Sequence, residues 1–149
     1  LMARTVTFRG RMSTNVEQVI RISRNDGLTG YRIKKFQLLP KKPISENATW
    51  LFQIFTVKQL THPQDETNFD NPTLMAAATF TQSSNPTDFP EDTNIIFDDK
   101  VVNQDIFIYS HRQNGSSCNY YLELEEVSLN LNEATVATLK DMRGRQKIK

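Results

Sequence analysis

The stretch that decides the fold is Tyr120-Tyr121-Leu122-Glu123-Leu124-Glu125, in which apolar and acidic side chains come to alternate. Successive side chains of a β-strand point to opposite faces, so this pattern predicts a strand with its leucines toward a core and its glutamates toward solvent. After Glu126 the alternation restarts at Val127, which predicts a β-bulge in this strand.

Comparable short segments recur along the rest of the chain. They predict further strands at residues 5–9, 16–23, 31–39, 50–58, 73–80, 94–97 and 105–110. The alternation slips by one at Lys34-Lys35-Phe36, so Phe36 and Leu38 reach the core only if a bulge intervenes. The run that begins at Trp50 is apolar on both faces and is expected to be a central, covered strand. About eight short strands indicate a mainly β protein, an antiparallel β-sandwich that is jelly-roll-like, and the 149 residues fit a single domain.

The end of the chain follows a different pattern. Asn132 is a good N-cap, Glu133 places an acid in the first helical turn, and Gly144 stands where a C-terminal cap belongs. A short helix is therefore predicted at about residues 133–143, followed by a basic tail at residues 144–149. The apolar side chains expected to pack onto the sheets are Val136, Leu139 and Met142.

The composition is globular with a polar bias, since 38% of residues are hydrophobic and 23% are charged. No run approaches the roughly 18 apolar residues of a membrane helix, and the first residues lack the apolar core of a signal peptide. We therefore expect no membrane partner. The single Cys118 cannot form an internal disulfide, which fits assembly inside a cell. No base lies near it in the sequence, so a passive thiol is expected rather than a nucleophile.

The net charge of +1 conceals three blocks of opposite sign. Residues 1–42 carry ten basic and two acidic side chains, residues 43–133 carry three and fourteen, and residues 134–149 carry five and one. Two interpretations stay open. In the first, oppositely charged strands lie side by side and cancel across a sheet. In the second, both basic ends gather into a patch that faces nucleic acid or the acidic face of another copy.

The sequence contains no recognisable catalytic, cofactor or metal motif. Its five glycines are far apart, so no phosphate-binding loop is predicted. His62 and His111 each lack a second His or Cys at ligand spacing. The acids around Asp98, Asp99 and Asp105 lack the spacing of a calcium loop, so solvated turn carboxylates are preferred to a cation site. We expect no enzyme activity, no cofactor, no metal and no small-molecule substrate.

The best candidate functional residues are basic and lie near the two ends of the chain. Short basic segments bind phosphate groups without needing a motif. We expect an N-terminal arm, residues 1–11, and the C-terminal tail to contact nucleic acid or neighbouring subunits. The side chains concerned are Arg4, Arg9, Arg11, Arg143, Arg145, Lys147 and Lys149.

The segments Asn119–Glu126, Asn132–Arg143 and Val102–Phe107 carry a resemblance. This final third of the chain resembles small, uncharacterised structural proteins of environmental (marine) viruses or phages. The resemblance implies a small viral β-sandwich protein that forms part of a capsid or of another virion component. The expected function is therefore that of a virion structural protein, assembled in the host cytoplasm, which contacts other copies of itself, other virion proteins or the genome.

Two other hypotheses belong to different functional classes. The first is a nucleic-acid-binding β module that uses the basic termini, and it predicts binding that weakens steeply with salt. The second is a carbohydrate-binding sandwich or enzyme, which requires an exposed aromatic platform or a cleft lined by acids. Trp50 is the only tryptophan and is expected to be buried in its strand, which speaks against a platform built on it.

Overall fold

The computed structural model describes residues 4–24, 27–42, 47–61, 66–82, 92–113 and 117–147, excepting the side chains of Asp92 and of residues 141–147. These residues form eight strands and one helix. In chain order they are β1 (Thr5–Met12), β2 (Val16–Ile20), β3 (Thr29–Pro40), β4 (Ala48–Phe55), β5 (Leu74–Gln82), β6 (Asp92–Phe97), β7 (Ile106–Gln113), β8 (Cys118–Ser128) and α1 (Leu131–Lys147). The predicted mainly β protein with about eight strands and a C-terminal helix is confirmed.

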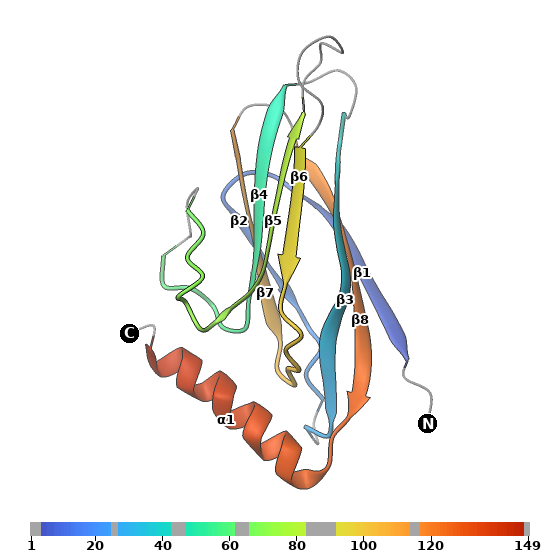
Figure 1. Cartoon of the computed structure of the whole chain (residues 1–149), viewed down its shortest axis with the longest axis vertical. Coiled ribbons are helices and arrows are strands. Elements are labelled where there is room, and N and C mark those ends of the chain that lie inside the picture. Colours follow the sequence, from blue (N-terminus) through green and yellow to red (C-terminus); the bar gives the residue numbers. More distant parts are fainter. Residues whose placement is uncertain are drawn as a thin grey trace.

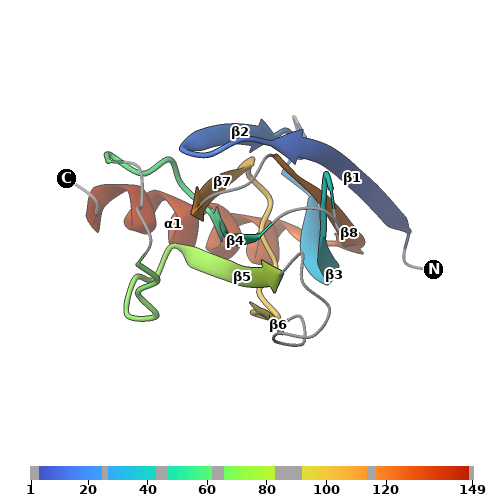
Figure 2. The same cartoon turned by 90° about the horizontal axis from the view of Figure 1, so that it is seen from above.

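The strands form two antiparallel sheets in a sandwich-like arrangement (Figure 1). One sheet has three strands in the order β1-β8-β3, and the other has five in the order β2-β7-β4-β5-β6. Figure 2 shows from above that β1 and β2 continue across from one layer to the other. Helix α1 follows β8 and crosses one end of the two sheets (Figure 1).

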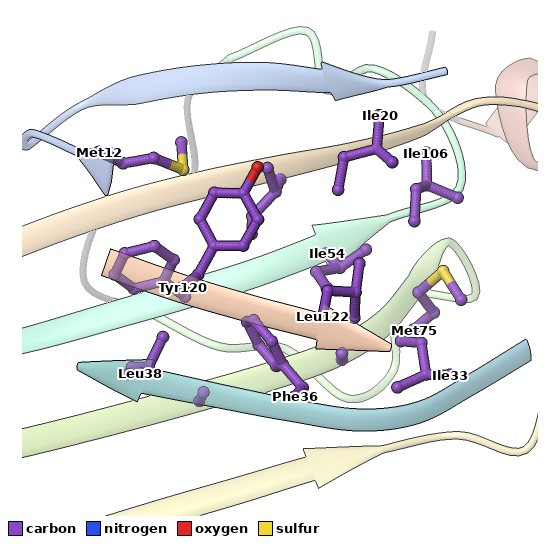
Figure 3. Packing of buried hydrophobic residues seen from close by; sticks show 14 of the residues in the cluster. Met12, Ile20, Ile33, Phe36, Leu38, Ile54, Met75, Ile106, Tyr120 and Leu122 are labelled. Atoms are coloured by element: carbon purple, nitrogen blue, oxygen red, sulfur yellow. The ribbon is translucent and has the colours of Figure 1, made fainter. Parts of the chain in front are cut away.

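The core lies between the sheets and takes apolar side chains from both (Figure 3). Leu122 of β8 and Phe36 of β3 belong to the same buried cluster as Ile54 of β4 and Met75 of β5. Trp50 is also buried, as predicted, and β4 lies between β7 and β5 in the five-stranded sheet, which confirms it as a central strand. Burying each such large side chain stabilises the fold by roughly 1.5–3 kcal/mol.

The bulge predicted in β3 is present. The pairing of β3 with β8 shifts by one residue between Ile33 and Lys35. The extra residue returns the later part of the strand to the correct phase, so that Phe36 and Leu38 are both buried. The slip in the sequence pattern therefore located a real irregularity of the backbone.

The prediction of a bulge in β8 after Glu126 is wrong. The pairing with β3 runs without a shift from Leu124 to Ser128, and Glu126 stands opposite Tyr31. The Glu126 carboxylate accepts hydrogen bonds from Arg24 Nη2 at 2.9 Å and from the Tyr31 hydroxyl at 3.3 Å. Glu126 therefore points to the same side of β8 as the buried Leu122 and Leu124, where its hydrogen bonds stabilise it. An acid at such a position makes a regular strand look interrupted in the sequence.

Helix α1 begins earlier and ends later than predicted. Asn130, not Asn132, is the N-cap, because Asn130 Oδ1 accepts the Glu133 backbone N–H at 2.9 Å. Glu133 Oε1 in turn accepts the Asn130 backbone N–H at 3.3 Å, which completes a capping box. The helix also continues through Gly144 to Lys147, so the predicted C-cap is an interior residue. A glycine inside a helix costs only about 1 kcal/mol.

The face of α1 that packs against the sheets differs from the predicted one. Ala134 is buried, whereas Val136 and Leu139 are 51% and 46% exposed. The buried Asn103 donates from Nδ2 to the Ala134 carbonyl oxygen at 3.3 Å and to Thr138 Oγ1 at 2.9 Å. This polar anchor holds Ala134 and Thr138 toward the sheets. The side chain of Met142, also predicted to pack, lies outside the described part.

No helix in the described part of the chain has both the length and the apolar character needed to cross a membrane.

Candidate functional site

The outward side chains of β1, β8 and β3 form rows across the three-stranded sheet. Antiparallel pairing fixes which residues of the three strands share a row. From the end near α1 toward the far end, the rows are Thr5-Glu125-Arg32, Thr7-Glu123-Lys35, Arg9-Tyr121-Gln37 and Arg11-Asn119-Leu39. Strand β8, whose sequence decides the fold, therefore also lies in the middle of this outer face.

The half of this face near α1 is neutralised by ion pairs. Arg32 Nε donates to Glu125 Oε2 at 3.0 Å, and Arg32 Nη1 lies 3.6 Å from Asp99 Oδ1. The hydrogen bond from Arg32 is the largest cause that lowers the pKa of Glu125 below its ordinary value. At the same end, on the opposite face of β8, Arg24 pairs with Glu126. In this half, the basic and acidic blocks of the sequence cancel across the sheet, as the first interpretation of the charge pattern proposed.

The other half of the face is basic and hollowed. A depression of about 780 Å³ is lined by the outward side chains Arg9, Arg11, Gln37, Leu39, Asn119 and Tyr121. No acidic residue occurs in the strand segments 9–12, 36–40 and 118–122 that form it. It lies at the end of the sheet away from α1 (Figure 1).

The side chains around the depression combine cations, a ring and neutral hydrogen-bonding groups. Arg9 and Arg11 are exposed on β1, and Arg11 Nε donates to Asn119 Oδ1 at 3.3 Å. Lys35 Nζ lies 5.9 Å from the centroid of the half-buried Tyr121 ring. Leu39 is 63% exposed at the rim. Such a surface can bind an anionic ligand that also presents a planar ring.

No family model, curated protein or solved structure matches the chain. The function of this face therefore rests on its own geometry.

The predicted basic residues are divided between two distant places. Residues 5–11, expected to be an arm, form most of strand β1 instead, and this places Arg9 and Arg11 in the depression. Arg4 lies just before β1, and its carbonyl oxygen accepts the Glu126 N–H at 2.7 Å. Strand β1 begins and helix α1 ends on opposite sides of the molecule (Figures 1 and 2).

The remaining predicted site residues belong to the C-terminal segment. Residues 144–147 of the expected tail belong to α1, not to a projecting segment. The side chains of Arg143, Arg145 and Lys147 lie outside the described part of the chain, as does the whole of Lys149. Their contacts with nucleic acid or subunits stay a prediction.

Sequence reasoning missed Tyr121, Lys35 and Gln37 as members of the site. A signal for Tyr121 was present, because the alternation places it opposite the buried leucines and therefore outward. The pairing of β8 with both β1 and β3 was not visible in the sequence. That pairing alone brings a tyrosine, two arginines and a lysine onto one face.

The acidic residues considered for a cation site are dispersed. Asp105 Oδ1 accepts the backbone N–H groups of Ile22 and Ser23 at 2.8 and 2.9 Å, which ties the chain after β2 to the start of β7. Burial acts to raise the pKa of Asp105, but these hydrogen bonds outweigh it, so the pKa lies below its ordinary value. Asp98 and Asp99 are exposed. Within the described residues, no group of three or more His, Cys, Asp or Glu side chains is placed to hold a metal ion.

Cys118 and His111 take no part in the depression. Cys118 starts β8, is wholly buried, and has its pKa raised to about 12 by that burial. The thiol therefore stays protonated at neutral pH, which agrees with the expected passive role. His111 Nδ1 lies 3.1 Å from Asn15 Oδ1, and His62 is outside the described residues.

Proposed function

We propose that the chain is a virion structural protein, a capsid or capsid-associated subunit, with a fold of the jelly-roll type. The observation that carries the proposal is the order of strand pairing. The pairs β1–β8, β2–β7 and β4–β5 are those made by folding a ribbon of eight strands at its middle. The pairs β3–β8 and β4–β7 are those made when that ribbon wraps into two layers.

One feature departs from the ideal jelly-roll order. Strand β6 pairs with β5 in the five-stranded sheet rather than completing the pair with β3. It lies at the edge of that sheet. Jelly rolls are common in viral capsids but also occur in lectin domains and cupins, so the strand order supports the function by analogy of fold.

Exposed apolar side chains on two separate elements support a role in subunit contacts. On α1, Leu131, Val136 and Leu139 are 75%, 51% and 46% exposed, although they lie in a helix held to the sheets. At the edge of the five-stranded sheet, Ile96 of β6 is 55% exposed, and Phe69, before β5, is 70% exposed. Both line a hollow of about 270 Å³.

The occupant we propose for these surfaces is a second copy of the chain. The hollow includes Asp98 and the exposed face of α1 carries Lys140, so these two side chains can form an ion pair across the contact. Because the surfaces differ, the contact is heterologous and builds rings or larger assemblies rather than closed dimers. Such growth is what a shell subunit requires.

Static light scattering of the full chain tests the proposal. We expect species larger than a monomer, with a mass that rises with protein concentration. The double variant V136Q/L139Q removes apolar side chains from the exposed face of α1 and should shift the protein toward the monomer. The variant K140Q removes the charge that faces Asp98 in the proposed contact, so a smaller shift in the same direction is expected. The control is T7Q, at an exposed position of β1 outside both surfaces, which should leave the mass unchanged.

Two results contradict the proposal. One is a strict monomer at low salt and at the highest concentration attainable. The other is assembly that V136Q/L139Q and I96T leave unchanged while circular dichroism shows both variants folded. Electron microscopy of the assembled fraction then distinguishes ordered rings or shells, which support the proposal, from amorphous aggregates, which oppose it.

A further inference from the structure

We propose that the depression on the outer face of β1, β8 and β3 is a binding site for single-stranded nucleic acid. The site is formed by the sheet, not by the basic arm and tail that the sequence suggests, and it is separate from the apolar surfaces of the proposed subunit contact. It therefore adds a second activity to that function.

The two arginines on β1 supply the phosphate contacts. Arg9 and Arg11 are two residues apart on one strand, so they lie on the same face about 7 Å apart along it. Both are exposed and both line the depression. That spacing lets them contact successive phosphates of an extended strand, each through the planar fork of a guanidinium.

Tyr121 supplies a stacking platform between the strands that carry the cations. It belongs to the central strand β8, and its side chain is half-buried. Lys35 stands opposite Glu123 at the border of the depression, and its Nζ lies 5.9 Å from the ring centroid, a weak contact that a base replaces.

Neutral groups lie beside the ring toward the far end of the sheet, whereas Glu123 follows it on the same face of β8 toward α1. Gln37 stands beside Tyr121 in the same row, and Asn119 is on the same strand face. Both side chains carry donors and acceptors that suit the edges of a base without favouring one sequence strongly.

The combination of a ring with flanking cations favours a single strand over other acidic partners. In a duplex the bases are stacked and paired, so they are not available to Tyr121. An acidic face of another copy would engage the arginines but offers no base to stack. A single strand uses both features of the depression at once.

Fluorescence anisotropy with labelled oligothymidylate and with labelled oligouridylate tests the proposal on the full chain. We expect both probes to bind at about 50 mM salt and to weaken steeply as salt is raised. The variant R9Q/R11Q should lose at least about tenfold in affinity, and its slope of log K against log salt should fall by about 1.4, since each phosphate contact contributes about 0.7. The variant Y121L should lose about tenfold with an unchanged slope, because stacking releases no counterions.

A matched control removes the same charge elsewhere. R21Q/K58Q neutralises two exposed basic side chains outside the depression and should change affinity by less than about threefold. Absence of binding by the wild type at about 50 mM salt would overturn the proposal. So would an R9Q/R11Q variant no weaker than R21Q/K58Q, or a loss confined to R143Q/R145Q/K147Q, which assigns binding to the C-terminal end of α1. If R9Q/R11Q instead abolishes self-association of a wild type that binds neither probe, the depression is a contact between copies.

Discussion

Replacing Asn103 should detach α1 from the two sheets. The Asn103 Nδ2 group donates to the carbonyl oxygens of Gly27 and Ala134 at 3.2 and 3.3 Å and to Thr138 Oγ1 at 2.9 Å. The amide has two hydrogens for these three acceptors, so at most two good hydrogen bonds form at once. At about 1 kcal/mol each, Asn103→Ala loses about 2 kcal/mol.

Removal of the Asn103 carbonyl oxygen partly offsets the loss of stability caused by Asn103→Ala. Asn103 Oδ1 is buried and has no hydrogen-bond partner among the described residues, so its removal recovers part of the desolvation penalty. We therefore expect Asn103→Ala to lower the free energy of unfolding by about 1–2 kcal/mol.

Asn103→Asp should be worse than Asn103→Ala by at least about 2 kcal/mol at neutral pH, because it places a buried carboxylate against three acceptor oxygens. Burial and these oxygens raise the pKa of the new carboxyl in the folded state. A raised pKa makes the variant lose stability as pH rises through it, so the deficit of Asn103→Asp should shrink from about pH 7 to about pH 4.

Urea unfolding and hydrogen exchange test both variants. The unfolding midpoint gives the global loss, and exchange in α1 should rise because a helix of 17 residues is marginal without its tertiary contacts. Thr135→Ala is the control, since Thr135 Oγ1 bonds only within α1. An Asn103→Asp variant as stable as Asn103→Ala, or unchanged exchange in α1, would refute the anchoring role.

Three further predictions concern single positions in or beside the core. Gly30→Ala should cost about 2 kcal/mol in urea unfolding, because an added Cβ would lie 2.6 Å from Val101 Cγ1. Cys118 should react with a thiol reagent only after denaturation; rapid reaction of the native protein near pH 8 would contradict its burial and its pKa of about 12. Asp105→Ala should cost about 2 kcal/mol at neutral pH. Because the pKa of Asp105 is lowered on folding, the difference between wild type and variant should persist above about pH 4 and vanish as pH falls through the lowered pKa; a difference independent of pH would contradict it.

Much of the strand layout could be predicted because alternation is a local property. The slip at Lys34 located a bulge correctly, since an extra residue shifts every later side chain to the other face. The same reasoning failed at Glu126. This acid points to the same side of β8 as the buried leucines, and Arg24, which is distant in the sequence, stabilises it there. It failed again on α1, whose rotation is fixed by hydrogen bonds from Asn103 rather than by its apolar residues.

The alternation of residues 120–125 by itself determined that this segment is a strand and which of its side chains are buried. It did not determine the partners of that strand. Tertiary structure placed β1 on one side of β8 and β3 on the other, because antiparallel pairing joins segments far apart in the chain. That choice cancels charges at one end of the face and leaves Arg9 and Arg11 beside Tyr121 at the other. The sequence thus specified the strand and its buried side, whereas the pairing of distant strands decided what its exposed side can bind.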